Sequence, residues 1–342
     1  YKDNPFFDET EYANLVAKQF GTKPTVFMLS NADLLNNLHS ALDYIDEPFA
    51  DSSALAVHIL SMHTQRQVTV ALSGDGADEI FGGYHKHMAH YRALTRPVTN
   101  KLITSAIPFL AVLPQSRNNK ISNTFRQMYR YGQGCILSDK ERYWRWCSFT
   151  SENDARKLFN SEIQQHVYAE RKVDILRHFD EDEEPDLNTV LLTDMNLVLA
   201  NDMLTKVDMM SMANSLEVRS PFLDHTVFDF AFTLPSSFKV DDQMKKKILQ
   251  DTFRHVLPES LYNRPKKGFE VPMLQWLKAD LQNMLNEYVC NEQFIKQQGL
   301  FNYAEIQKLR HQLFSSNPGE SHARMWGLLV FQYWYKKYIS EN

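Results

Sequence analysis

The sequence predicts an α/β fold in which a parallel sheet is followed by a large helical part. Up to Tyr84, strand-like and helix-like segments alternate, which is the pattern of parallel βαβ units. Residues Val68–Leu72 form a short apolar, β-branched run typical of a buried parallel strand. After Tyr84 convincing strands vanish, and helical periodicity broken by prolines takes their place. We therefore expect residues 1–88 to form the α/β part and residues 89–342 a helical part of the same domain.

The composition is that of a soluble globular protein, with 43% hydrophobic and 23% charged residues among 342. A formal net charge of −5 gives no general attraction to nucleic acid or to anionic membranes. The longest apolar run, Leu102–Leu113, is too short to span a bilayer. Three widely spaced cysteines provide neither a disulfide framework nor a metal pair, which predicts reduced thiols in a cytoplasmic protein. The chain begins at Tyr1 without Met or a signal peptide, so we expect a piece of something longer.

The first elements follow from apolar spacing and helix stop signals. Glu9–Phe20 is expected to be a helix that ends at Gly21, and Thr25–Leu29 is expected to be a strand. Ser30 and Asp33 have the spacing of a capping box, with Asp in place of the usual Glu or Gln. They open a helix whose expected core face is Leu34, Leu35, Leu38, Leu42 and Ile45.

A loop, Asp46–Ser53, then leads to a helix expected at about Ala54–Thr64. The Val68–Leu72 strand follows, and after it comes the stretch Ser73–Tyr84. This stretch holds four glycines and three carboxylates, namely Gly74, Gly76, Gly82, Gly83, Asp75, Asp78 and Glu79. Dense glycines mark a tight turn or the close approach of a ligand, and open α/β sheets bind ligands where their strands end.

The carboxylates of this loop would repel a bare phosphate, but they suit a divalent cation such as Mg²⁺ that bridges carboxylate and phosphate oxygens. An acidic N-cap on a helix starting near Ala77 would explain one carboxylate without any ligand. The loop does not match G-x-G-x-x-G, because Glu79 occupies the last glycine position, and the chain has no G-x-x-x-x-G-K-[ST] motif.

Two further stretches carry dense charge. Asn201–Asp224 is expected to be helical to about Ala213, with Asp202 and Lys206 one turn apart. Its charged residues are too many for so apolar a segment without mutual pairing, which indicates a buried polar network that is either structural or substrate-facing. The loop Asn263–Pro272 contains Lys266 and Lys267, which either aim cations at a phosphate or form a solvent-facing basic turn.

Together these stretches resemble the synthetase domain of the glutamine-hydrolysing asparagine synthetases. The resemblance runs over most of the chain, through Asp46–Asp51, Ser73–Tyr84, Lys206–Asp224, Arg264–Phe269, and the C-terminal helix with Trp326 and Trp334. It implies an adenine nucleotide alpha hydrolase-like (ATP pyrophosphatase) fold with a helical subdomain. It also implies adenylation of the aspartate side-chain carboxylate by ATP, followed by attack of ammonia released from glutamine by an N-terminal glutaminase domain.

The resemblance assigns roles by position. Asp78 corresponds to the carboxylate that holds Mg²⁺ and pyrophosphate. Asp75 stands where the family often has a Glu assigned to ammonia deprotonation. Lys266, with Lys267 beside it, corresponds to the lysine that steadies the adenylation transition state. Ser73, Gly74, Asp75 and Gly76 would line the nucleotide, and the aspartate side would draw on Asp51, Lys206, Asp208, Glu217, Arg219 and Asp224.

The chain departs from the family in one respect. The pyrophosphate-binding loop S-G-G-x-D-S is absent and would lie upstream of Tyr1, so we expect a sheet that is incomplete at its N-terminus. Relatives that amidate another carboxylate or close β-lactams provide a second interpretation, and a catalytically incomplete scaffold module provides a third. A homodimer is a further expectation, whereas nucleic acid and membranes are not expected partners.

Overall fold

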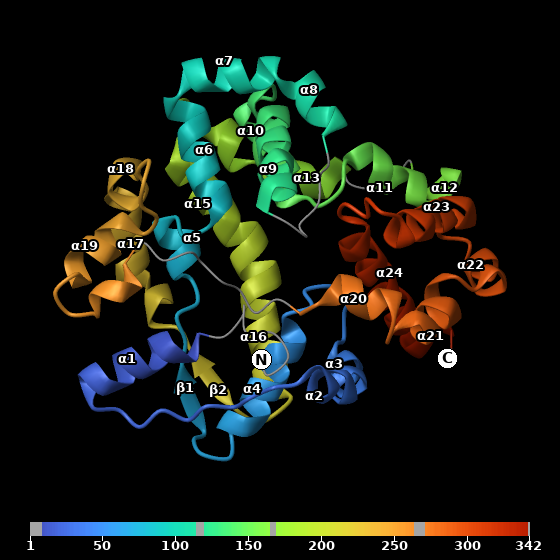
Figure 1. Cartoon of the computed structure of the whole chain (residues 1–342), viewed down its shortest axis with the longest axis horizontal. Coiled ribbons are helices and arrows are strands. Elements are labelled where there is room, and N and C mark those ends of the chain that lie inside the picture. The colour runs from blue at the N-terminus through green and yellow to red at the C-terminus, as the bar shows by residue number, and fades with distance from the viewer. Residues whose placement is uncertain (1–8, 114–119, 165–168, 263–270, 341–342) are drawn as a thin grey trace. The chain divides into compact units, whose positions relative to one another are not determined.

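A two-stranded parallel sheet links the beginning of the chain to its middle (Figure 1). The computed structural model describes residues 9–113, 120–164, 169–262 and 271–340. Strand β1 (Val70–Leu72) pairs in parallel with β2 (Glu217–Arg219), with Ala71 opposite Val218. The predicted parallel sheet is confirmed. The prediction that strands vanish after Tyr84 is wrong, because β2 is a strand. It has three residues, two of them charged, so it does not stand out in the sequence as an apolar run.

Two other strand predictions are also wrong. Val70 and Leu72 are 40% and 73% exposed, so β1 is not a buried strand. Within the described residues the sheet has only two strands, which leaves the outward side chains of β1 uncovered. Thr25–Leu29 forms no strand and runs as an irregular segment ahead of Ser30.

Internal contacts divide the chain into two compact units. Unit 1 comprises Tyr1–Asp46, Asp51–Met88 and Leu191–Val271, and unit 2 comprises Glu47–Ala50, Ala89–Val190 and Pro272–Asn342. Residues Leu191–Val271 belong to unit 1 although they are distant in sequence from its first segments. They are joined to those segments because helix α16 packs on α4 and β2 pairs with β1. The sequence-based division into residues 1–88 and 89–342 stays a prediction.

Unit 1 surrounds the sheet with short helices. Besides β1 and β2, its elements are α1 (Thr10–Phe20), α2 (Asn31–Asn36), α3 (Leu38–Tyr44), α4 (Ala54–Thr64), α5 (Ala77–Phe81), the π-helix η2 (Met195–Leu204), α16 (Thr205–Met212), the 3-10 turn η3 (Pro221–Leu223), α17 (His225–Thr233), α18 (Ser236–Lys239), α19 (Lys247–Phe253) and the 3-10 turn η4 (Glu259–Leu261). The division between the units falls within the residue ranges of two helices, α6 (His85–Thr95) and α15 (Leu187–Asp194).

The first helices of unit 1 follow the sequence closely. Helices α1 and α4 confirm the two predicted spans, and Gly21 ends α1 in the left-handed conformation, with φ 64°. The predicted capping box is present, because the Ser30 hydroxyl accepts the Asp33 N–H while the Asp33 carboxylate accepts the Ser30 N–H. The single helix predicted after it is split at Asn37 into α2 and α3. Its expected core face is nevertheless confirmed, since all five residues are buried except the half-buried Leu35.

Unit 2 is helical throughout the described residues, apart from one isolated bridge between Phe159 and Phe301. Its elements are α7 (Pro97–Ser105), α8 (Ile107–Val112), α9 (Lys120–Cys135), α10 (Asp139–Cys147), α11 (Glu152–Leu158), α12 (Ser161–Gln164), α13 (Ala169–Ile175), α14 (His178–Glu181), α20 (Met273–Lys278), α21 (Gln282–Met284), η5 (Leu285–Val289), α22 (Glu292–Gln298), α23 (Tyr303–Phe314), α24 (Ser321–Tyr335) and η6 (Lys336–Ser340). None of the helices that the structure describes has the length and apolarity needed to cross a membrane.

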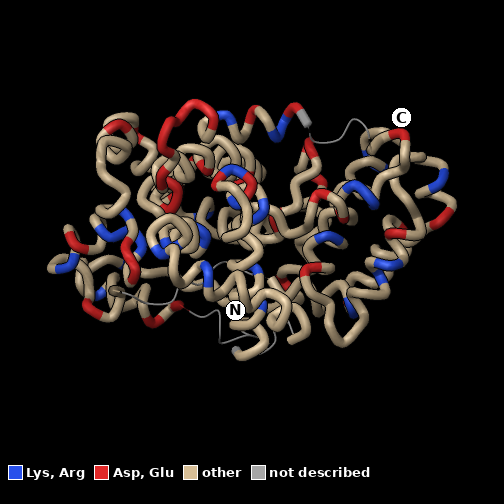
Figure 2. The backbone as a smooth tube through the Cα atoms, turned by 90° about the horizontal axis from the view of Figure 1, so that it is seen from above, with Lys and Arg blue, Asp and Glu red and all other residues tan. Residues whose placement is uncertain are grey.

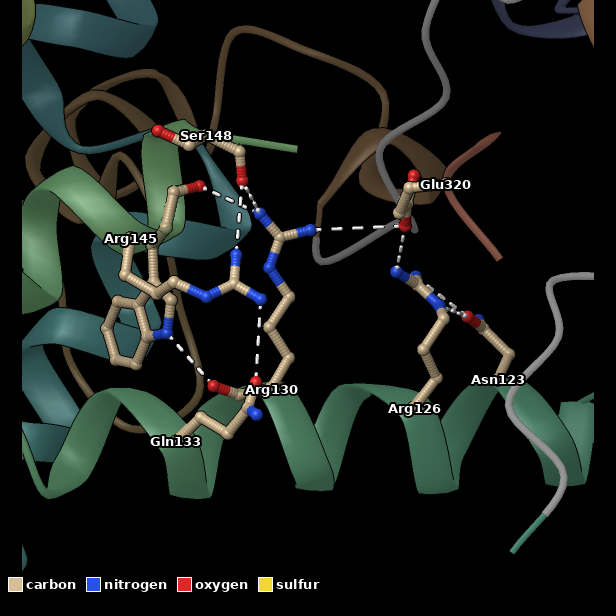
Figure 3. A network of polar contacts seen from close by, with 8 residues as sticks. Asn123, Arg126, Arg130, Gln133, Arg145, Ser148 and Glu320 are labelled. Carbon is tan, nitrogen blue, oxygen red and sulfur yellow. Dashed lines mark hydrogen bonds and ion pairs between the residues drawn. The ribbon is translucent and has the colours of Figure 1, made fainter. Parts of the chain in front are cut away.

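An arginine network ties helix α9 of unit 2 to neighbouring elements (Figure 3). Arg126 contacts the Glu320 carboxylate at 2.7 Å, just ahead of α24. Arg130 donates to the backbone carbonyls of Trp146 and Ser148 at 3.2 and 2.7 Å, and the Trp146 indole donates to the Arg130 carbonyl. These basic side chains are therefore already used to join helices. Figure 2 shows that acidic and basic residues are interspersed along most of the chain.

Candidate nucleotide-binding site

The glycine-rich loop follows β1 at the edge where both parallel strands end (Figure 1). The Ser73 N–H donates to the Arg219 carbonyl at 2.9 Å, and the Ser73 and Ser220 hydroxyls lie 2.8 Å apart. These bonds join the segment after β1 to the segment after β2. The edge formed in this way is the place where open α/β sheets bind ligands.

Three of the four glycines are needed by the protein itself. Gly76 has φ 87°, and a Cβ there would lie 2.3 Å from Leu223 Cδ2. Gly82 has φ 73°, and a Cβ there would lie 2.4 Å from Val240 Cγ2. A Cβ on Gly83 would lie 1.6 Å from Asp78 Oδ1. Packing therefore accounts for all three without a ligand.

Gly74 is different from the other three glycines. No heavy atom lies within 4 Å of a Cβ built on it, and its φ is not positive. Neither packing nor backbone conformation requires glycine at this position. Open space directly after a parallel strand leaves room for a ligand to approach the backbone.

The three carboxylates of the loop have different surroundings. Asp78 is partly exposed, and its Oδ1 lies 3.0 Å from Lys246 Nζ. Asp75 is half-buried, and its backbone N–H donates weakly to the Ser73 hydroxyl at 3.5 Å. Glu79 is buried and accepts a 2.6 Å hydrogen bond from the Tyr84 hydroxyl, and burial raises its pKa. Glu79 therefore belongs to the interior, whereas Asp75 and Asp78 remain accessible.

The interpretation of the loop as an acidic N-cap is wrong. The N-cap of α5 is Gly76, and no side chain makes a capping hydrogen bond there. Asp78 and Glu79 nevertheless lie in the first turn of α5, where negative charge is favourable, whereas Asp75 lies ahead of the helix.

A divalent cation at this loop would depend on few protein ligands. The described residues contain no group of three or more His, Cys, Asp or Glu side chains suited to a metal. Mg²⁺ at nucleotide sites commonly binds one or two carboxylates, with water and phosphate oxygens completing its shell. The accessible Asp78 carboxylate fits that pattern, and the neighbouring Lys246 supplies a second positive charge that the sequence did not single out.

A second polar cluster in unit 1 is centred on the buried Lys206. Its Nζ donates to Asp51 Oδ2 at 2.7 Å and to the Ser53 hydroxyl at 3.0 Å. Burial opposes ionisation of Asp51, but Lys206 and the hydrogen bonds from Ser53 hold the pKa of that carboxyl below its usual value. Asp202, one helical turn before Lys206, has its pKa raised to about 7 by burial and by the Asp51 charge. The cluster therefore has one ionised and one readily protonated carboxyl around a single ammonium.

Only part of the predicted network is buried. Asp208 is exposed, and Glu217 pairs with Arg219 at 2.7 Å on the surface. Asp224 is exposed and caps α17 by accepting the Thr226 N–H at 2.9 Å. The structure thus joins Asp51 to Lys206 and leaves the other predicted substrate-side residues outside that cluster. Asp202 is the third member of the Lys206 cluster, and its position one turn before Lys206 was the sequence signal for it.

We expect the raised pKa of Asp202 to make the protein less stable as pH rises. The folded state holds this proton up to about pH 7, whereas the unfolded chain releases it near 3.8, so this group's contribution is lost between those values. Asp202→Asn mimics the protonated form and should therefore stabilise the protein at about pH 8 and clearly less at about pH 5. Urea unfolding at both pH values measures this. A stability difference that is the same at both would contradict the shift.

A third cluster could not be predicted, because its members are separated by more than a hundred residues in sequence. Asp194 is fully buried and bonds Lys86 Nζ at 2.7 Å and His87 Nε2 at 2.6 Å. His87 Nδ1 accepts the Tyr84 N–H at 3.4 Å, so Nε2 carries the hydrogen that goes to Asp194. Burial lowers the His87 pKa, which keeps the ring neutral. Burial opposes ionisation of Asp194 as well, yet the Lys86 charge and the His87 hydrogen bond hold its pKa well below the usual value.

This cluster fixes the segment that follows the glycine-rich loop. Lys86 and His87 open α6, and Asp194 directly precedes η2. The predicted Lys266 and Lys267, by contrast, lie outside the described residues.

The chain belongs to the asparagine synthase family, whose model matches residues 1–336. It is 28% identical to asparagine synthetase [glutamine-hydrolyzing] 1 of Bacillus subtilis, over 98% of this chain and 52% of that protein. It is 27% identical to a putative asparagine synthetase [glutamine-hydrolyzing] of Mycobacterium tuberculosis, over 98% of this chain and 50% of that protein. The chain thus spans about half the length of these curated relatives.

Proposed function

We propose that the chain is the synthetase part of an ATP-dependent amide ligase that converts aspartate to asparagine. The observation that carries the proposal is the loop after β1, where open backbone at Gly74 lies four residues before Asp78, whose carboxylate pairs with Lys246. Its family membership and the small parallel sheet support an ATP pyrophosphatase-like fold. The substrate would be a carboxylate, which is a poor acyl donor until a phosphoryl leaving group is attached to it.

The residues of the loop would divide the work of nucleotide binding. Ser73, Gly74 and Gly76 line the nucleotide, and the Asp78 carboxylate holds Mg²⁺, which when bound would neutralise the charge of the departing pyrophosphate. Lys246, together with the predicted Lys266 and Lys267, would place positive charge where that pyrophosphate charge accumulates. Asp75 would stand near the attacking ammonia.

The aspartate side of the site would draw on the Lys206 cluster. The Lys206 ammonium is complementary to the carboxylate of an amino acid, and the ionised Asp51 is complementary to its ammonium group. Asp202 changes charge near neutral pH. Asp208, Glu217, Arg219 and Asp224 stay proposals as further members. Glutamine as ammonia source, a glutaminase domain upstream, a homodimer and a cytoplasmic location belong to the same proposal.

The test is carboxylate-dependent exchange of labelled pyrophosphate into ATP, since exchange reports adenylation without the amidation step. The protein is assayed together with its upstream segment, and aspartate is compared with glutamate, β-alanine derivatives and no acid. We expect exchange with aspartate only, and asparagine formation when ammonium salts are added. Exchange with another acid would point to a different amidotransferase or a β-lactam-forming enzyme, and no exchange at all would point to a scaffold.

Lys266→Ala should lower aspartate-dependent exchange by about a hundredfold, because a cation is lost where charge develops in the transition state. The unfolding midpoint should stay unchanged, since the sequence predicts a loop at Lys266 and a loop lysine contributes little to stability. Unchanged exchange would remove Lys266 from the mechanism. Lys296→Ala, on the surface of α22 in unit 2, is the matched control and should leave exchange intact.

A further inference from the structure

Helices α7, α8 and the start of α9 expose large apolar side chains. Val98, Leu102, Phe109, Val112 and Ile121 are each at least 66% exposed, and we refer to them as the α7–α8 patch. The three helices contact one another within unit 2 (Figure 1). Single exposed apolar residues are ordinary, but five on adjoining helices form a surface that calls for a binding partner.

The patch is not the face by which these helices pack. Ile103 and Ile107 turn towards α9, where a Cβ on Gly132 would meet them at 3.3 and 3.0 Å, and Leu110 is buried. Helices α7 and α8 are therefore apolar on two faces, and the described residues of the unit pack on one of them. Apolar residues on the other face gain nothing from folding.

The helices that form the patch carry basic but no acidic residues. Helices α6, α7, α8 and α9 contain no Asp or Glu, and no acidic residue occurs between Glu79 and Asp139. Lys101 is exposed beside Leu102, in a chain whose formal net charge is −5. The basic residues of this interval are Lys86, Arg92, Arg96, Lys101, Arg117, Lys120, Arg126 and Arg130. Three of them, Lys86, Arg126 and Arg130, are held by Asp194 or Glu320, and the chain's acidic excess lies elsewhere.

We propose that the α7–α8 patch docks the protein on an anionic membrane surface. Its apolar side chains would enter the boundary between headgroups and acyl chains, and Lys101 would contact lipid phosphates. Thr99, exposed on α7, carries a hydroxyl that can donate to the same phosphate oxygens. The net charge of the whole chain predicts no membrane attraction, but the charged residues on the helices of the patch are all basic.

The test is flotation of the purified chain with vesicles of phosphatidylcholine alone or mixed equally with phosphatidylglycerol. We expect binding to the mixed vesicles, loss of that binding at high salt, and weak binding to phosphatidylcholine. The double variant Leu102→Ser, Phe109→Ser should bind the mixed vesicles at least about tenfold more weakly, because two inserted apolar side chains are removed. Lys101→Glu should weaken binding to the mixed vesicles about tenfold without changing the binding to phosphatidylcholine.

Phe230→Ser is the matched control, since Phe230 is an exposed aromatic on α17 next to Asp229 and should leave vesicle binding unchanged. Circular dichroism confirms that each variant is folded. Equal binding by the double variant and the unchanged chain would overturn the proposal, as would equal binding to both kinds of vesicle. A concentration-dependent dimer that the double variant abolishes, in sedimentation without lipid, would also overturn it and assign the patch to a second copy of the chain.

Discussion

Asp78→Ala is expected to abolish aspartate-dependent pyrophosphate exchange while the protein stays folded. Its carboxylate is the accessible acidic group of the glycine-rich loop that contacts a cation, Lys246 at 3.0 Å, and it is the proposed protein ligand of Mg²⁺. Without it, the pyrophosphate charge would lose its fixed point of attachment to the protein. Exchange measured over a wide range of Mg²⁺ concentration checks this, because a lost metal ligand is partly rescued by high Mg²⁺.

Gly83→Ala tests the same carboxylate without touching it. Gly83 has no positive φ, so its backbone accepts alanine, but the new Cβ would lie 1.6 Å from Asp78 Oδ1 and force that carboxylate to move. A displacement of about 1 Å at a reacting centre costs about a hundredfold in rate. We expect a loss of that size in exchange, together with a lower unfolding midpoint, because the new Cβ would also lie 3.0 Å from Asp78 Cα.

Gly74→Ala is the matched variant for Gly83→Ala. Its Cβ meets no protein atom within 4 Å, so the free energy of unfolding should hold or rise slightly. If the open space receives the nucleotide, the KM for ATP rises while the kcat changes little. Full exchange by Gly83→Ala would show that the position of Asp78 is unimportant, and an unchanged KM in Gly74→Ala would place the nucleotide elsewhere.

The parts of the fold that the sequence predicted well are those specified by local signals. The capping pair Ser30–Asp33 and the stop at Gly21 each act within a few residues. Strand β2 was missed because Glu217 and Arg219 are charged surface residues, which do not indicate a strand in the sequence. These residues form a strand because they pair with β1. Such pairing joins residues far apart in sequence and leaves no local periodicity.

The candidate site shows the same division. The glycine and carboxylate pattern located the loop after β1, but it did not separate Gly74 from the glycines that packing requires. Nor did it show that Glu79 is buried against Tyr84. Lys246 and Asp194 carried no signal, because a single lysine or aspartate is recognisable only by what it contacts.

Asp194→Ala is expected to destabilise the protein by about 3–5 kcal/mol, because it leaves the Lys86 charge and the His87 N–H without their buried acceptor. Urea unfolding near neutral pH measures the loss. Replacing both members of the ion pair by apolar residues, Lys86→Met with Asp194→Leu, should recover part of it, since no uncompensated charge then remains. A double variant as unstable as Asp194→Ala would show that the lost stability comes from packing at this site and not from an uncompensated charge.

The same cluster predicts the direction of the pH dependence. Asp194 has a folded pKa below its usual 3.8, and neutral His87 has a folded pKa below its usual 6.5, so both groups bind fewer protons folded than unfolded. Their contributions are complete above about pH 6.5 and are lost as pH falls, first through His87 and then through Asp194. Asp194→Ala should therefore lose less stability than the unchanged protein between about pH 5 and pH 3. A steeper acid loss in the variant would mean that Asp194 is already protonated in the folded protein, and that Lys86 and His87 do not hold its charge.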